Sequence, residues 1–375
     1  MQNTAPLASP KTLGLCLLFA LLLPAGLARL RAQSLPAYGN AFLDLGVEAQ
    51  AEALGRTTLA APYAPGQGRV NPSLLPTMPS QHSLLGCFAL QFSGMANLEY
   101  LEYSYRADSL NGLSGGLLRF SVPGIQNTLA WRDANGQEDY TRITRFTASD
   151  YALFLSYGRR LPVQGLAAGG ALKLLYRLVG PFAQAFGVGV DLSLSYSQRD
   201  LLLALALRDV TTTFTGWFID QEKLRIVAPD SVFNVPRAKD LELRLPSVEL
   251  AAGYRFAAGQ YHRFWFGVNL VCTFDGRAQT LLHARHLALE PRVGFSWSYR
   301  AIVHIRAGVR QWQWYEDYDG SRALSATPSL GLGFSAWNCT LDYAITAPAL
   351  VGSYRLSHML SFAYQFGRPF IHNIP

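Results

Sequence analysis

Few residues of this sequence have the types and spacing that metal binding or catalysis requires. The run 317–320, Asp-Tyr-Asp-Gly, is a fragment of a calcium-loop pattern without its full spacing or its closing glutamate, so a plain turn explains it. His283 and His286 lie three positions apart with no third ligand nearby, which argues against a metal site. The sequence also has no Gly-x-Ser-x-Gly nucleophile motif. We therefore expect no enzyme activity, no metal and no cofactor.

Four polar residues lie in two segments where polar or small residues alternate with apolar ones. His304, Arg306 and Arg310 alternate with apolar residues along 301–310, and Asp191 does the same within 186–197. Strict alternation predicts a β-strand, because successive side chains point to opposite faces. If the strands form a membrane barrel, these residues face the lumen. A role in contacting a ligand is the alternative interpretation.

The segment 186–197 shows the pattern most clearly. Its odd members are small or charged, and its even members are apolar: Val188, Val190, Leu192, Leu194 and Tyr196. In a soluble sandwich the apolar face would contact a second sheet. In an outer-membrane barrel it would contact lipid. This segment alone does not choose between the two.

Composition favours the membrane. Hydrophobic residues make up 50% of the chain, aromatic residues 12% and charged residues only 15%, against a usual charged fraction of about 25%. Such a chain suits a protein that exposes apolar side chains to lipid and aromatic side chains to the membrane interfaces. The net charge is +7, but no cluster of Lys and Arg with interleaved aromatic residues is present, so nucleic-acid binding is not expected.

Residues 1–32 have the features of a secretory signal peptide. Lys11 supplies a basic n-region, Leu13–Leu23 is an apolar h-region, and cleavage is expected near Ala32-Gln33. The apolar run is shorter than the roughly 20 residues of a spanning helix, although an uncleaved anchor is the alternative. The cysteines that follow, Cys87, Cys272 and Cys339, are widely spaced, so we interpret them as small apolar packing residues rather than disulfide partners.

The remaining chain divides into two parts. Residues 33–83 are rich in proline, lack sustained alternation and include a helix-like piece at Phe42–Leu54, so we predict an N-terminal plug or lid. Residues 84–375 predict an all-β transmembrane antiparallel barrel of about 14 strands. The expected strands are 84–93, 97–105, 113–122, 149–158, 164–177, 186–197, 200–208, 245–256, 262–274, 290–299, 301–310, 327–336, 338–346 and 356–366.

The predicted connections alternate in length, which favours a membrane barrel over a soluble sandwich. Long connections are expected at 123–148, 178–185, 209–244, 275–289, 311–326 and 347–355. The connection 94–96 is an exception, because it is short at a position where the alternation of lengths requires a long connection. Charged and aromatic residues gather in the long connections. We predict that the aromatic ones either form an interfacial girdle or bind a partner: Trp217, Phe218, Trp312, Trp314, Tyr315 and Tyr318.

The N-terminal part resembles the opening of the PorV/PorQ family of outer-membrane proteins. That family has a phrase of the form F-L-x-x-G-x-x-A-x-A-x-x-x-G, followed by Asn-Pro-Ala. The matching residues here are Phe42, Leu43, Gly46, Ala49, Ala51, Gly55, Asn71 and Pro72. Segment 207–220 and the stretches LELRLPSVELAAGYRF and TFDGRAQT also resemble family phrases. The resemblance implies a FadL-like barrel of fourteen strands with an N-terminal plug.

Better-known members of that family serve type IX secretion, so the resemblance implies a non-enzymatic accessory that handles secreted proteins. Its expected partners are outer-membrane lipid and secreted proteins or components of the secretion machinery. The alternative function is a FadL-like transporter of hydrophobic small molecules, and a soluble periplasmic β protein is the third hypothesis. The expected location is the cell outer membrane.

Overall fold

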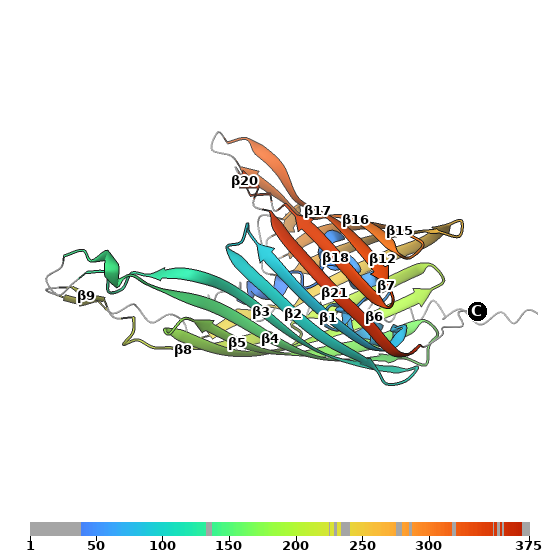
Figure 1. Cartoon of the computed structure of the whole chain (residues 1–375), viewed down its shortest axis with the longest axis horizontal. Helices are drawn as coiled ribbons and strands as arrows, with labels where there is room; N and C mark the ends of the chain where they lie inside the picture. Colours follow the sequence, from blue (N-terminus) through green and yellow to red (C-terminus); the bar gives the residue numbers. More distant parts are fainter. Residues whose placement is uncertain are drawn as a thin grey trace, which may run out of the picture. The chain divides into compact units, whose positions relative to one another are not determined.

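A computed structural model of the chain describes residues 39–132, 137–224, 226–228, 231–233, 241–274, 280–284, 287–316, 320–347, 349–350, 353–354 and 356–369. Residues Ala37–Pro375 form one compact unit (Figure 1). The predicted signal peptide lies outside the described residues.

The unit is a closed antiparallel β-barrel of 14 strands, as the alternating segments predicted. Each strand pairs with its neighbours along the chain, and β1 closes the ring by pairing with β21. The wall strands are β1 Ser80–Gln91, β2 Ala96–Arg106, β3 Asn111–Asn127, β4 Thr144–Arg160, β5 Leu166–Val179, β6 Ala183–Gln198, β7 Leu201–Arg208, β12 Ser247–Ala258, β13 His262–Thr273, β15 Leu287–Tyr299, β16 Val303–Glu316, β17 Arg322–Ala336, β18 Cys339–Thr346 and β21 Ser357–Pro369.

Shorter strands extend or decorate this wall. β8 (Thr213–Ile219) continues β7 along β6, and β11 (Leu241–Arg244) pairs with β8 just before β12 begins. β14 (Leu282–Ala284) folds back on β15. Two small hairpins, β9–β10 (Ile226–Ala228 and Ser231–Phe233) and β19–β20 (Ala349–Leu350 and Ser353–Tyr354), lie in the connections.

The two faces of the wall have the polarity of a membrane barrel. On β6, Phe186 is 54% exposed and Leu192 44%, whereas Asp191 between them is 4% exposed. Large apolar side chains are exposed in the same alternating way on every wall strand. Among the described residues, no helix is both long enough and apolar enough to cross a bilayer. The exposed apolar band and the closed ring place the chain in the outer membrane, which confirms the predicted location.

Connection length follows the end of the barrel. All six connections at one end are short: 107–110, 161–165, 199–200, 259–261, 300–302 and 337–338. In the two-residue turn Trp337-Asn338 both residues have positive φ, as such hairpin turns require. The three-residue turn 300–302 also has Arg300 and Ala301 at positive φ. The long connections lie at the opposite end, at 128–143, 220–240, 274–286 and 347–356. Short turns face the periplasm in such barrels.

Three of the predicted connections need correction. The predicted loop at 178–185 is the tight turn 180–182, because Gly180 takes a left-handed conformation and lets β5 and β6 run to its edges. The predicted loop 311–326 is mostly strand, because β16 runs on to Glu316 past a bulge at 310–313. β3 and β4 extend into 123–148 in the same way, past a bulge at 122–125. The first connection is a real four-residue turn, 92–95, between paired strands.

One wall strand is interrupted. β7 ends at Arg208 and β8 resumes at Thr213, so 209–212 forms an irregular break along β6, with Asp209 and Thr212 at positive φ. The neighbouring strand is interrupted at the same level, between β11 and β12, where Pro246 has no N–H to donate to a sheet. The break turns Asp209 inward, where its side chain is 1% exposed.

The N-terminal segment, residues 39–79, lies against the inner face of the wall. Its short helices are η1 Ala41–Asp44, α2 Ala49–Ala53, η2 Thr58–Ala60, α3 Gln67–Val70 and η3 Pro72–Thr77. η3 contacts β2 to β6, η2 contacts β7, β12 and β13, and α2 contacts β16, β17, β18 and β21. The helix predicted at Phe42–Leu54 is therefore two short helices, because Leu45 and Glu48 are extended.

Glycine allows this segment to approach the wall at backbone distance. A Cβ atom on Gly308 of β16 would overlap the backbone of Leu54 and Gly55. Gly55 itself has φ +62°, and a Cβ there would come within 2.8 Å of the backbone nitrogen of Val309. Only glycine on both sides permits this contact.

Candidate ligand-binding site

A largely apolar pocket opens at the end of the barrel that carries the long connections. Its volume is about 450 Å³, within the usual range of about 300–1,000 Å³ for small-molecule sites. Strands β3, β4, β5, β6 and β8 supply its wall, together with the connections that follow β3, β5 and β8. The lining residues are Gln126, Asn127, Thr128, Leu129, Phe146, Val179, Phe182, Ala183, Trp217, Ile219 and Leu224.

The tight turn between β5 and β6 places Phe182 in this pocket. The backbone N–H of Phe182 donates to the carbonyl of Val179 at 3.0 Å, and the N–H of Asp220 donates to the carbonyl of Phe182 at 2.8 Å. The Phe182 ring meets the Phe146 ring edge to face, with centroids 5.2 Å apart. Gly180 makes this possible, because a Cβ there would collide with the Phe146 ring. The apolar wall is thus held from three strands.

Trp217 joins the pocket to charged residues deeper in the lumen. The guanidinium carbon of Arg177 lies 4.9 Å from the Trp217 ring centroid and 5.8 Å from that of Phe42. Arg177 also forms ion pairs with Asp150 at 2.7 Å and with Glu242 at 2.8 Å. One arginine therefore links the pocket, three wall strands and the N-terminal segment.

The indole N–H of Trp217 is a buried donor. Among the residues that the structure describes, it has no hydrogen-bond partner. A buried donor without a partner costs about 1–3 kcal/mol. An acceptor atom supplied from outside the protein would remove that cost.

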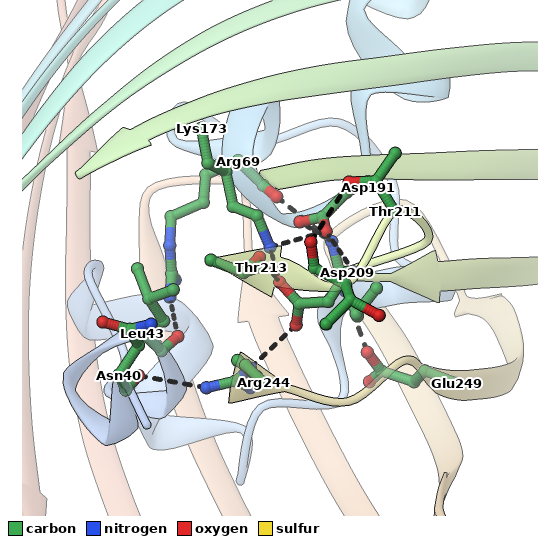
Figure 2. A network of polar contacts seen from close by, with 12 residues as sticks. Asn40, Leu43, Arg69, Lys173, Asp191, Asp209, Thr211, Thr213, Arg244 and Glu249 are labelled. Atoms are coloured by element: carbon green, nitrogen blue, oxygen red, sulfur yellow. Dashed lines mark hydrogen bonds and ion pairs between the residues drawn. The ribbon is translucent and has the colours of Figure 1, made fainter. Parts of the chain in front are cut away.

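A network of buried charges lies below the pocket (Figure 2). The Lys173 ammonium donates to Asp191 at 2.7 Å and to Asp209. The backbone N–H of Asp209 donates to Asp191 at 2.8 Å, and Arg244 pairs with Asp209 at 2.7 Å. Thr213 also donates to the Asp209 carboxylate. The break in the wall strand therefore carries the carboxylate that organises this network.

The same network ties the wall to the N-terminal segment. Arg244 donates to the carbonyl of Asn40 at 3.1 Å and pairs with Asp44. Arg208 donates to the carbonyl of Val70 at 2.6 Å. Figure 2 shows Arg244 beside Asn40 of the segment, with a dashed line between them. These contacts hold the segment by its backbone carbonyls as well as by a carboxylate.

A second set of ion pairs holds the opposite side of the segment. Glu52 pairs with Arg56 at 2.8 Å and with Arg310 of β16, and Arg306 donates to Gln50 at 3.2 Å. Burial alone would raise the pKa of the Glu52 carboxyl, but Arg310 and Arg56 outweigh it and hold that pKa below its usual range. The Glu52 carboxylate is therefore ionised throughout the neutral range.

The polar residues singled out from the sequence lie in this interior. Asp191, Arg306 and Arg310 are buried and form ion pairs. His304 is half-buried, and its ring nitrogens lie 2.7 Å from the Ser298 hydroxyl and 3.0 Å from the Ser335 hydroxyl. All four have partners in the protein, so they support the structure of the lumen.

The aromatic residues expected in the long connections are divided between faces. Trp217 and Phe218 lie in β8, not in a loop: Trp217 lines the pocket and Phe218 is 63% exposed on the outer face. Trp312 and Trp314 lie in β16, where Trp314 is exposed. The prediction of a loop was wrong for these residues, because the strands continue beyond the expected ends. Outside the described residues are Tyr318, the side chain of Tyr315, and the Asp317, Asp319, His283 and His286 side chains.

The residues that carried the family resemblance pack the N-terminal segment into the lumen. All eight are buried: Phe42, Leu43, Gly46, Ala49, Ala51, Gly55, Asn71 and Pro72. The Asn71 amide donates to the carbonyl of Leu59 at 2.7 Å and accepts from the Ser73 hydroxyl. In the described part of the chain, no group of three or more His, Cys, Asp or Glu side chains could hold a metal ion.

Sequence reasoning missed Lys173, Asp209 and Arg177. Lys173 and Arg177 lie four residues apart on β5, and both occupy inward-facing positions. The alternation that identified Asp191 could therefore have identified them as well. Asp209 had no such signal, because it lies in the strand break rather than in the alternation.

Comparisons with known proteins define the fold. No protein-family model matches the sequence, and no curated protein matches it. The structure is similar to the crystal structure of the Pseudomonas putida toluene transporter TodX, with a TM-score of 0.59 and 12% identity over 86% of this chain and 98% of TodX. It is also similar to the Ralstonia pickettii toluene transporter TbuX, with a TM-score of 0.53 and 14% identity over 86% of this chain and 99% of TbuX. The monoaromatic hydrocarbon channel CymD matches with a TM-score of 0.53 and 12% identity over 86% of this chain and 98% of CymD.

These matches correct the prediction of a secretion accessory, because the solved barrels that share this fold are described as transporters and channels. They give no support to the PorV/PorQ assignment or to partners in a secretion machinery. They do confirm the barrel fold that the resemblance implied. The chain has the fold of the FadL-type outer-membrane barrels.

Proposed function

We propose that this barrel carries hydrophobic small molecules across the outer membrane, with the pocket at the long-connection end as the site of capture. The observation that carries the proposal is the apolar lining of that pocket around Phe146, Phe182 and Trp217. A water-facing apolar cavity at the outer mouth of a barrel favours molecules that leave water. The solved barrels of similar fold that transport toluene or conduct monoaromatic hydrocarbons support the same substrate class.

The size and chemistry of the pocket favour a compact ligand. A volume of about 450 Å³ accommodates a single aromatic ring with small substituents. The unpaired indole N–H of Trp217 favours a ligand that also carries one acceptor atom. The process involves no chemical step, so the protein acts as a conduit and not as an enzyme.

The N-terminal segment acts as a plug in this proposal. It contacts strands around the ring and is held by ion pairs on two sides, Arg244 with Asp44 and Arg310 with Glu52. Arg177 touches both Trp217 at the pocket and Phe42 on the segment. A ligand that moves Trp217 would therefore disturb a contact that holds the plug.

Filling the pocket tests the capture step. We expect Ala183→Trp to weaken binding of radiolabelled toluene to the purified protein by roughly tenfold or more, because the new indole occupies the space of a small ligand. Ala252→Trp is the matched control, since Ala252 of β12 is exposed on the outer face. Equal binding by the wild type and Ala183→Trp would show that this pocket is not the capture site.

A further inference from the structure

A second recess lies at the opposite end of the barrel, where the turns are short. It occupies about 470 Å³ between the turns 259–261 and 300–302. Its lining residues are Gln260, Tyr261, Arg263, Arg300 and Ile302. Unlike the pocket at the other end, this recess is bordered by two positive charges.

The two arginines are positioned without a carboxylate. The Arg300 guanidinium carbon lies 4.5 Å from the Tyr261 ring centroid and 5.5 Å from that of Tyr299. No carboxylate among the described residues lies within 4.0 Å of a nitrogen of Arg263 or Arg300. By contrast, Arg255 of the neighbouring strand lies 3.7 Å from Asp200. The recess thus presents two guanidinium groups that can still accept an anion.

The recess lies at the height of a membrane interface. On the outer face beside it, His262 and Trp297 stack with ring centroids 5.9 Å apart, and the Trp297 indole N–H donates to the His262 ring at 3.1 Å. Tyr299 contacts the same histidine ring at 5.3 Å. Aromatic residues with polar edges mark the boundary between the acyl chains and the headgroups. Lipid headgroups therefore lie at the level of this recess.

Positive charge is concentrated at this end of the barrel. The six short turns, with the two strand residues on either side of each, carry six arginines but only two carboxylates, Asp108 and Asp200. The arginines are Arg106, Arg159, Arg160, Arg199, Arg263 and Arg300. Such an excess attracts anionic lipids to this rim.

We propose that the recess between the turns 259–261 and 300–302 binds the phosphate of an anionic phospholipid of the periplasmic leaflet. Arg263 and Arg300 donate hydrogen bonds to the phosphate oxygens, and Tyr261 and Tyr299 hold the Arg300 guanidinium in place. The acyl chains extend along the outer aromatic face of β13 and β15. A zwitterionic lipid binds less well, because its ammonium group offsets the phosphate charge.

Native mass spectrometry of the detergent-purified full chain tests this proposal. With phosphatidylglycerol or phosphatidylcholine added at equal concentration, the wild type should retain phosphatidylglycerol preferentially. The double variant R263Q/R300Q should lower that affinity roughly tenfold or more. Arg159→Gln is the matched control, because Arg159 is exposed at the same end and does not line the recess. Gel mobility with and without heating verifies that each variant is folded.

Three results would overturn the proposal. Unchanged phosphatidylglycerol retention by R263Q/R300Q would show that the two arginines do not form the site. Equal retention of the two lipids by the wild type would show that no anionic headgroup is selected. Displacement of the lipid by inorganic phosphate at a matching concentration would assign the site to free phosphate instead. If R263Q/R300Q does not fold, Arg300→Gln alone replaces it and should lower the same affinity severalfold.

Discussion

Replacing Lys173 with alanine is expected to destabilise the folded barrel by about 3–5 kcal/mol. Lys173 is buried, and its ammonium is the shared cation between Asp191 and Asp209. Removing it leaves two carboxylates close together in the interior with less positive charge to neutralise them. Water cannot screen this repulsion well, because Asp209 is only 1% exposed. Equilibrium unfolding in urea, followed by tryptophan fluorescence of the protein in detergent micelles, measures the loss.

Two further variants separate the charge from the packing. Lys173→Met keeps most of the side-chain volume and should lose nearly as much stability as Lys173→Ala. Lys223→Ala removes an exposed ion pair with Asp220, with a separation of 3.0 Å, and should cost less than about 1 kcal/mol. Stability close to the wild type for Lys173→Met would mean that the buried charge does not hold this region together.

Replacing Gly308 with valine is expected to displace the N-terminal segment and open the lumen. The added Cβ would overlap the backbone of Leu54 and Gly55, and backbone atoms cannot move aside as a flexible side chain can. Overpacking of this kind typically costs about 1–3 kcal/mol. The wall is held by a continuous hydrogen-bonded ring, so the segment yields first. In planar bilayers, Gly308→Val should show ion conductance where the wild type shows little or none.

Gly115→Val provides the matched control for this experiment. Gly115 lies in β3, and a Cβ there meets nothing within 4 Å. This variant should conduct no more than the wild type. If Gly308→Val and Gly115→Val conduct equally, the segment is not what closes the lumen, and the proposed plug is wrong.

The barrel could be predicted from the sequence because two physical regularities are local. Alternation along 186–197 reports the two faces of a strand directly, and every connection at one end of the barrel is short, as at 199–200 and 337–338. Strand ends were less predictable. Gly180 makes a turn that looks like part of a loop, and the extensions of β16 and β3 beyond the membrane band have less regular alternation because bulges shift the pattern.

The interior could be predicted only in part. Asp191, Arg306 and Arg310 follow from alternation, but their partners come from other strands or from the N-terminal segment. The break that turns Asp209 inward depends on how β7, β8 and β12 pair, which no short window of sequence shows. The pocket likewise combines five strands and three connections.

The secretion prediction failed for a related reason. Its support came from a phrase that includes Phe42, Gly55 and Asn71, and these residues pack the segment against the wall. A phrase of this kind reports how a segment fits inside a barrel. It carries no information about which molecules meet the outer mouth, where the lining residues are Phe146, Phe182 and their neighbours.

The most direct measurement is the uptake of radiolabelled toluene by proteoliposomes that contain the purified full chain. Transport of hydrophobic small molecules predicts faster saturable accumulation with the wild type than with protein-free liposomes. It also predicts a rate for Ala183→Trp close to the protein-free background, with Ala252→Trp close to the wild type. Equal rates for the wild type, Ala183→Trp and protein-free liposomes would contradict transport through this barrel.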